Sequence, residues 1–219
     1  MSVKAAFATL LMLVIAAFLG FFTAKHSNDI VATFKPTTVV YTAKPHGSSE
    51  TMEYSSKRWE ELIPEQEREV LSKYQAKDAV KVTDMVAQIL NSIESANDEK
   101  YKQAMISSNT VSILEGQSVS LPGFIVPVDF YPNRQPKNIF LVPYFGACIH
   151  FPPPPPNQII FIRLEPGFSN FDLNQAYTIK GKLKIELFED LMGTSAYSMD
   201  VAQIKEFNGE PDTFRKHTR

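Results

Sequence analysis

Proline constrains this 219-residue chain more than any other residue type. Ten of its 15 prolines lie between Pro122 and Pro156, and five of these are consecutive, Pro152 to Pro156. Proline fixes its own φ angle and has no backbone N–H, so the five together hold a polyproline II strut about 15 Å long. We interpret the strut as a rigid strap between two strands. The alternative is a ridge that docks into an aromatic groove of a partner.

Five short apolar runs, separated by turn residues, flank this strut. They are Val119–Asp129, Ile139–Phe145, Gln158–Leu164, Ala176–Leu187 and Ala196–Phe207. No helical pattern long enough for a crossover lies between them, so the runs predict a small antiparallel barrel or sandwich of five strands. Pro122 and Pro127 fall inside the first run. They indicate an edge position or bulges there, because proline cannot donate to a strand ladder.

The fourth run separates apolar from charged side chains by alternation. The predicted apolar face holds Ile179, Gly181, Leu183, Ile185 and Leu187, and the opposite face holds Lys180, Lys182 and Lys184. We interpret the lysine row as a solvated face that discourages aggregation. Binding of anionic lipid or nucleic acid is the alternative.

The middle of the chain has the pattern of helices. Pro64 followed by Glu65 and Glu67 is typical of a helix start, with acidic residues near the positive end of the helix dipole. A second helix is predicted after Asp78, a suitable N-cap. Its apolar positions are Val82, Val86, Ile89 and Ile93, with spacings of four, three and four. We interpret this stripe as a packing face.

The N-terminus contains twenty residues without a charge, Ala5 to Ala24. As a helix they would span about 30 Å, the thickness of a bilayer core. Phe22 occupies a position where a cleavage site requires a small residue, so we favour an uncleaved signal-anchor. The sequence then predicts a single-pass protein of the bacterial inner membrane, held by residues 5–24, with its C-terminal domain in the periplasm. A secreted or periplasmic protein after signal cleavage is the alternative.

Charge and cysteine content exclude several classes of protein. The chain has 22 Lys and Arg against 24 Asp and Glu, a formal charge of −2, which argues against a general nucleic-acid binder. Cys148 is the one cysteine. An intramolecular disulfide and a zinc site made of several cysteines are therefore both excluded.

Cys148 and His150 are candidates for chemistry because they lie two residues apart. In an extended segment both side chains point the same way, with Cα atoms about 6.5 Å apart, so they could share a zinc or copper ion. A third ligand would come from Asp129, Asn157 or a partner chain. The same pair could instead serve as nucleophile and base of a thiol-dependent enzyme. A further alternative is that Cys148 is a small buried hydrophobe.

One long run resembles the signature of an uncharacterised bacterial family of exported proteins, known only as a domain of unknown function. The run extends from Val142 to Gln158 and reads VPYFGACIHxPPPPPNQ, where x is Phe151. Three further motifs carry the resemblance, which covers about residues 58–208. They are Trp59-x-x-Leu62-x-Pro64, Leu121-Pro122-Gly123-Phe124-Ile125-Val126-Pro127 and Gly193-x-x-Ala196-Tyr197-x-Met199.

The resemblance implies a periplasmic or membrane-attached location, a partly OB-like β domain and kinship with metal- or export-related transporter systems. It carries no established activity. Many relatives resemble lipoproteins, but this chain lacks the N-terminal cysteine that lipid attachment requires.

We therefore expect an α+β protein with an N-terminal transmembrane helix, a short helical segment and a five-stranded antiparallel OB-like barrel or sandwich. The expected divisions are signal-anchor 1–24, tether 25–56, helical segment 57–106, OB-like domain 107–209 and tail 210–219. The expected function is that of a non-enzymatic accessory protein that serves a transporter component and binds no nucleic acid; a purely structural assembly module is an alternative. The residues expected to bind the partner are Tyr144, Pro152, Pro153, Pro154, Pro155, Pro156, Asn157 and Gln158.

Overall fold

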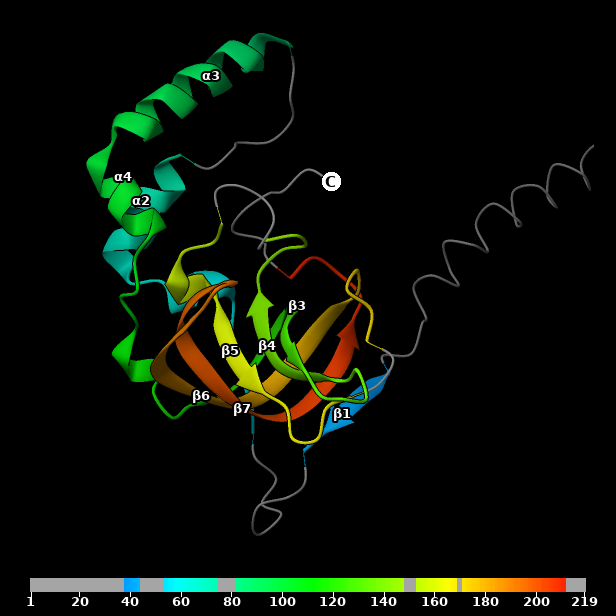
Figure 1. Ribbon diagram of the computed structural model, residues 1–219. Coiled ribbons are helices and arrows are strands. Elements are labelled where there is room, and N and C mark those ends of the chain that lie inside the picture. The colour runs from blue at the N-terminus through cyan, green and yellow to red at the C-terminus, as the bar shows by residue number, and fades with distance from the viewer. Residues whose placement is uncertain (1–37, 44–52, 75–81, 148–152, 169–170, 212–219) are drawn as a thin grey trace, which may run out of the picture. The chain divides into compact units, whose positions relative to one another are not determined.

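A computed structural model describes residues 38–43, 53–74, 82–147, 153–168 and 171–211, all of which belong to one unit of the chain (Figure 1). The strands are β1 (Val39–Thr42), β2 (Ser55–Ser56), β3 (Ser118–Phe130), β4 (Pro136–Val142), β5 (Ile160–Arg163), β6 (Ala176–Asp190) and β7 (Gly193–Phe207). The helices are η1 (Trp59–Leu62), α2 (Glu65–Lys73), α3 (Val82–Asn97), α4 (Glu99–Met105), η2 (Ser112–Leu114) and η3 (Pro156–Gln158), where η denotes a 3-10 helix.

Five strands of the seven-stranded sheet close a ring. β3 pairs with β4, β4 with β5, β5 with β7, β7 with β6, and β6 returns to β3. The β5–β7 pair is parallel, while the other four pairs of the ring are antiparallel. β1 adds to β7 in antiparallel fashion, and the short β2 adds to β3 in parallel. The ring therefore leaves β3 and β7 each with three neighbours.

The two faces of the ring strands enter two different apolar clusters. The larger cluster draws side chains from all five ring strands, including Ile139 and Leu141 of β4, and so fills the enclosed face. Phe140 and Val142 alternate with them and belong to the second cluster on the outer face, which β3, β4 and β5 share with Tyr144. These strands are apolar on both faces because both faces are covered.

A glycine allows two strands of the ring to approach closely. A Cβ atom on Gly181 of β6 would lie 2.5 Å from the carbonyl oxygen of Asp200 and 2.7 Å from Cγ of Met199 on β7. The register between β6 and β7 also shifts next to this glycine. A side chain at position 181 would therefore collide with the backbone of β7.

The predicted antiparallel five-stranded OB-like barrel or sandwich is wrong as stated. The five apolar runs coincide with β3 to β7, but the sheet has seven strands, and the β5–β7 and β2–β3 pairs are parallel. The physical reason is that β6 intervenes between β5 and β7 in the chain. The chain reverses twice before β7 pairs with β5, and an apolar run does not specify its partner.

The predicted membrane span at residues 5–24 lies outside the described residues, as does most of the predicted tether. Within the described ranges, no helix combines the length and the apolar character needed to cross a bilayer. This finding counts against the predicted transmembrane helix and against the predicted single-pass location in the inner membrane.

The first α-helix of the helical segment begins where the sequence predicts. α2 begins at Glu65 with Pro64 as its N-cap residue, and Leu71 is buried. The predicted packing stripe on α3 behaves differently, because Ile89 and Ile93 are each 55% exposed. This part of the stripe does not pack on the rest of the described chain.

Candidate functional site

Residues from three sequence motifs meet Glu67 of α2 in one place, which we call the motif junction. The motif residues are Trp59, Leu62, Asn157, Gln158 and Tyr197, all of them buried. The indole Nε1 of Trp59 donates to the carbonyl oxygen of Pro122 at 2.7 Å. The carbonyl oxygen of Trp59 in turn accepts from Nε2 of Gln158 at 2.8 Å. Trp59 is 1% exposed and Gln158 is 0% exposed, so both hydrogen bonds are shielded from water. They fasten η1 to β3 and to the end of the proline run.

Tyr197 of β7 supplies the second fastening of the junction. Its hydroxyl donates to the carbonyl oxygen of Leu62 at 2.9 Å and accepts from the backbone N–H of Val111 at 2.7 Å. Burial raises the pKa of Tyr197 to about 12, against the lowering effect of the Val111 hydrogen bond and with a smaller contribution from the charge of Glu67. The phenol therefore remains neutral and able to donate at ordinary pH.

Glu67 of α2 forms the third part of the junction. Its Oε1 accepts from Oγ of Ser107 at 2.7 Å and from Nδ2 of Asn109 at 2.6 Å, and its Oε2 accepts from Nδ2 of Asn157 at 3.0 Å. Nδ2 of Asn157 also donates to the carbonyl oxygen of Asn109. One carboxylate thus joins α2, the segment after α4 and η3.

Two side-chain oxygens of the junction lack a hydrogen-bond partner among the described residues. They are Oδ1 of Asn157 and Oε1 of Gln158, both on side chains that are 0% exposed. Their amide nitrogens are all engaged in holding other segments. Apart from these two oxygens, the junction's side-chain hydrogen bonds described above hold one segment of the fold to another.

The strap, defined as residues 143–158, is packed at both of its described ends. Tyr144 and Ala147 belong to the outer apolar cluster at one end, and Pro154 and Pro155 are buried at the other. Phe145 is 43% exposed and makes an edge contact with Phe124, with ring centroids 5.8 Å apart. Asn157 and Gln158, the last two residues of the predicted docking set, lie in the motif junction.

Three predicted site residues, Cys148, His150 and Pro152, lie outside the described residues. Of the proposed third metal ligands, Asp129 is paired with Lys137 at 3.4 Å, and Asn157 donates to Glu67. In the described part of the chain, no group of three or more His, Cys, Asp or Glu side chains is placed to hold a metal ion. The zinc or copper site therefore stays a prediction.

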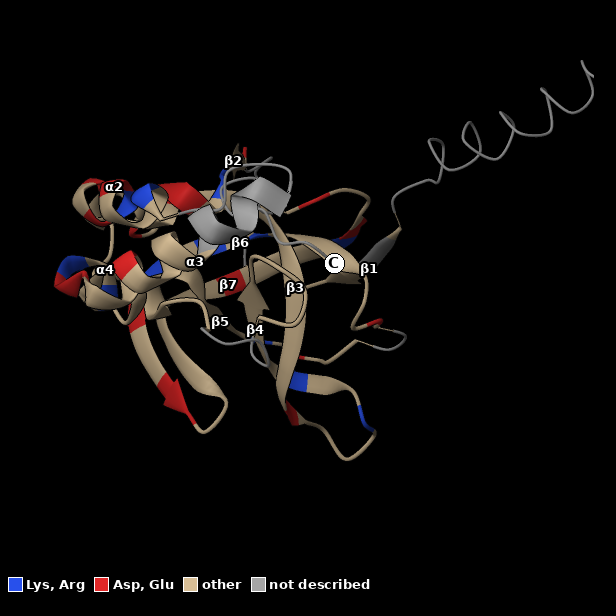
Figure 2. Ribbon diagram, turned by 90° about the horizontal axis from the view of Figure 1, so that it is seen from above, with Lys and Arg blue, Asp and Glu red and all other residues tan. Residues whose placement is uncertain are grey.

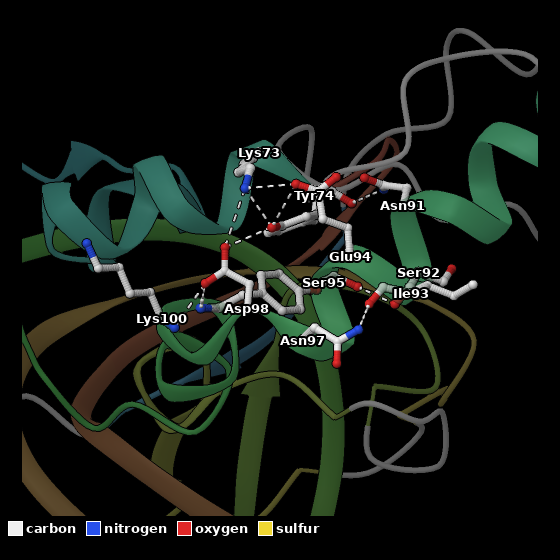
Figure 3. Close-up of polar contacts among 11 residues, drawn as sticks. Lys73, Tyr74, Asn91, Ser92, Ile93, Glu94, Ser95, Asn97, Asp98 and Lys100 are labelled. Atoms are coloured by element: carbon white, nitrogen blue, oxygen red, sulfur yellow. Dashed lines mark hydrogen bonds and ion pairs between the residues drawn. The ribbon is translucent and has the colours of Figure 1, made fainter.

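A second polar cluster joins the three helices (Figure 3). Nζ of Lys73 lies 3.1 Å from Oε1 of Glu94 and donates to the hydroxyl of Tyr74 at 2.7 Å. That hydroxyl donates to Oδ2 of Asp98 at 2.8 Å, while Oδ1 of Asp98 accepts from the backbone N–H groups of Lys100 and Tyr101. The Tyr74 hydrogen bond lowers the pKa of Asp98, with the Tyr101 amide acting in the same direction. This cluster caps α4 and orients α3.

Positively and negatively charged residues are spread over the helices and the strands (Figure 2). In the predicted lysine row, Lys184 pairs with Asp200 at 2.7 Å, and Nζ of Lys180 lies 5.6 Å from the ring centroid of Tyr54. Two of the three lysines thus have partners within the fold. This favours the interpretation as a solvated face over binding of an anionic ligand.

The fold and the junction together define a class of protein: a closed ring of strands that carries a helical segment on buried hydrogen bonds. The chain belongs to the family described as protein of unknown function, DUF3299, whose model matches residues 59–206. It is similar to the crystal structure of a DUF3299 family protein (PA4066) from Pseudomonas aeruginosa PAO1. The two are 27% identical with a TM-score of 0.51, over 73% of this chain and 99% of that chain. No curated protein matches the chain.

The predicted resemblance to an uncharacterised family is confirmed by this match. Sequence reasoning identified Trp59, Leu62 and Tyr197 as motif residues without a role, and the structure gives each a role in the junction. It missed Glu67, Ser107 and Asn109. Glu67 looked like an ordinary acidic residue in the first turn of a helix, and no local pattern distinguishes the two roles.

Proposed function

We propose that the chain is a non-enzymatic accessory protein that binds a partner protein through the strap. The observation that supports this proposal is the way the strap is held. Both described ends are packed into the fold, while Phe145 and Pro153 are exposed on either side of residues 148–152. Residues that the fold already holds at both described ends of the strap lose little conformational entropy when a partner binds them.

The test is to compare partner recovery by the wild-type chain and by a Phe145→Ala, Pro153→Ala double variant. Both side chains are exposed, so we expect the variant to fold normally and to recover a reduced amount of any partner that the wild type retains from its native cell. Leu173→Ala is the matched control, because Leu173 is 51% exposed and lies outside the strap. Equal recovery by wild type and double variant would remove the strap as the docking element.

The finer part of the proposal is that the partner is a component of a metal- or export-related transporter, and that Cys148 and His150 hold zinc or copper. It depends on the spacing of these two residues in the sequence. The chain, purified without a histidine tag, should bind the metal, and Cys148→Ala or His150→Ala should weaken that affinity by tenfold or more, an order-of-magnitude expectation for loss of one ligand. Unchanged affinity in both variants, or no binding by the wild type, would end this part of the proposal.

We also propose an exported location, in the periplasm or outside the cell. The uncharged run Ala5 to Ala24 supports export. Cell fractionation with mass determination of the mature chain is the test. A full-length chain recovered in the cytoplasm contradicts this location.

A further inference from the structure

One apolar face of α3 has no cover within the described chain. Ile89, Leu90 and Ile93 are 55%, 61% and 55% exposed. The apolar cluster of the helical segment consists of Ile63, Leu71 and Ala104 with Val70, Tyr101 and Met105 packed against it, and no described side chain of α3 belongs to it. Three large aliphatic side chains on two adjacent turns of one helix are a patch that a partner surface could bury.

The opposite side of α3 is held by polar contacts. Nδ2 of Asn91 donates to the carbonyl oxygen of Tyr74 at 3.2 Å, and Glu94 pairs with Lys73 at 3.1 Å. Figure 3 shows Asn91 and Glu94 turned toward Tyr74, with Ile93 turned away. At about 100° per residue, positions 89 and 93 lie roughly opposite positions 91 and 94. These contacts keep the apolar face directed away from α2, so α2 does not cover it.

We propose that this face pairs with the same face of α3 in a second copy of the chain, with the two helices antiparallel. The apolar positions 82, 86, 89 and 93 have spacings of four, three and four, which read the same in both directions. An antiparallel copy therefore sets position 82 opposite 93 and position 86 opposite 89, the layers of a two-stranded antiparallel coil. Such a two-fold pairing is closed, because each copy contributes the same surface.

Length and charge define the kind of pairing. The 16 residues of α3 span about 24 Å. Two helices of this length bury about 1,000 Å² at most, the lower limit of a specific interface, so the dimer forms and dissociates with concentration.

α3 contains Asp84 and Glu94 but no lysine or arginine. That composition disfavours an anionic membrane surface as the cover, since interfacial helices present basic residues to lipid.

Sedimentation of the full chain between about 10 and 500 µM tests the pairing, because this range includes the dissociation constants of weak dimers. We expect the wild-type mass to rise toward that of a dimer and an Ile89→Gln, Ile93→Gln double variant to keep a lower mass throughout. Ile113→Gln is the control, because Ile113 is 76% exposed but lies on η2. Thermal unfolding of the variants checks that the exposed substitutions leave the fold intact.

Two results would overturn the proposal: a wild-type mass that stays constant over this range, or a double variant that associates as the wild type does. Flotation with phosphatidylglycerol vesicles accompanies the sedimentation. Vesicle binding that the double variant loses, with no self-association, would assign the face to a membrane and overturn the dimer.

Disulfide formation tests the direction of the helices in a Cys148→Ser background. We expect Val86→Cys and Ile89→Cys chains, when mixed, to cross-link, because their Cα atoms would approach within the 4.4–6.8 Å that a disulfide requires. Ile93→Cys alone should not cross-link to itself, because in the antiparallel pair the two copies of position 93 are about 16 Å apart along the axis. Efficient cross-linking of Ile93→Cys to itself would contradict the antiparallel arrangement.

Discussion

A single hydroxyl group, that of Tyr197, satisfies two backbone groups that lie far from it in the sequence. Its hydrogen bonds to Leu62 and Val111 cross 135 and 86 positions of the chain. Each of these backbone groups needs a partner because the surroundings of the Tyr197 ring exclude water. The residue is therefore more than an apolar filler of the core: it fixes where the helical segment attaches to β7.

We expect Tyr197→Phe to lower the free energy of unfolding by about 1–3 kcal/mol, because it leaves one N–H and one C=O unpaired in the interior. Urea unfolding measures the difference. Tyr101→Phe is the matched control, since the Tyr101 hydroxyl makes no hydrogen bond within the described chain and its ring packs on Tyr74. Equal loss in both variants would mean that the hydroxyl contacts do not stabilise the fold.

The same residue gives the stability of the protein a pH dependence. Burial raises the pKa of Tyr197 to about 12, whereas an unfolded tyrosine titrates near 10. Because the folded pKa is the higher one, this contribution is complete below about pH 10 and is lost as the pH rises through 12. Between about pH 10 and pH 12 the Tyr197→Phe variant should therefore lose less stability than the wild type does. It should still lose some, because burial also raises the pKa values of Tyr41 and Tyr177.

For the individual strands and helices, the local sequence pattern predicted their positions well. It predicted less well which of their side chains are buried. On β6, Ile179 and Leu183 are buried as alternation predicts, but Leu187 is 59% exposed. A register shift between Ile185 and Phe188 explains the difference. It turns Phe188 toward β5, where its ring stacks on Phe161 with centroids 3.7 Å apart. A bulge is set by the pairing with β7 and leaves no mark in the local alternation.

The missed strands have a similar cause. β1 and β2 have four and two residues, too few to show a period, and they become strands only because β7 and β3 offer edges to pair with. The docking set was predicted from the proline run and the motif around it. The structure divides it between exposed Pro153 and buried Asn157 and Gln158, a division that depends on which segments cover the ring.

Closing the ring requires pairing of strands that lie far apart in the sequence, such as β3 with β6. Within the ring, β6 and β7 approach closely beside Gly181, where a Cβ atom would lie 2.5 Å from the carbonyl oxygen of Asp200. We expect Gly181→Ala to destabilise the fold by about 1–3 kcal/mol through overpacking, because the added methyl group would crowd the carbonyl oxygen of Asp200 in the paired strand β7. Chemical denaturation measures the effect.

Thr178→Ala, on the same strand and half-buried, is the control for this substitution and should cost less. If Gly181→Ala and Thr178→Ala unfold at the same denaturant concentration, the close approach does not limit the fold.

Local patterns in the sequence were sufficient to predict the positions of the five ring strands, the start of α2 and the motif residues, because hydrophobic period and proline act locally. Three features follow from the folded chain alone: β5 and β7 run parallel, Glu67, Asn157 and Tyr197 meet, and the stripe of α3 has no cover in the described chain. These features arise from contacts between residues up to 135 positions apart. Such contacts depend on which surfaces the whole chain can bury at once, and no local segment carries that information.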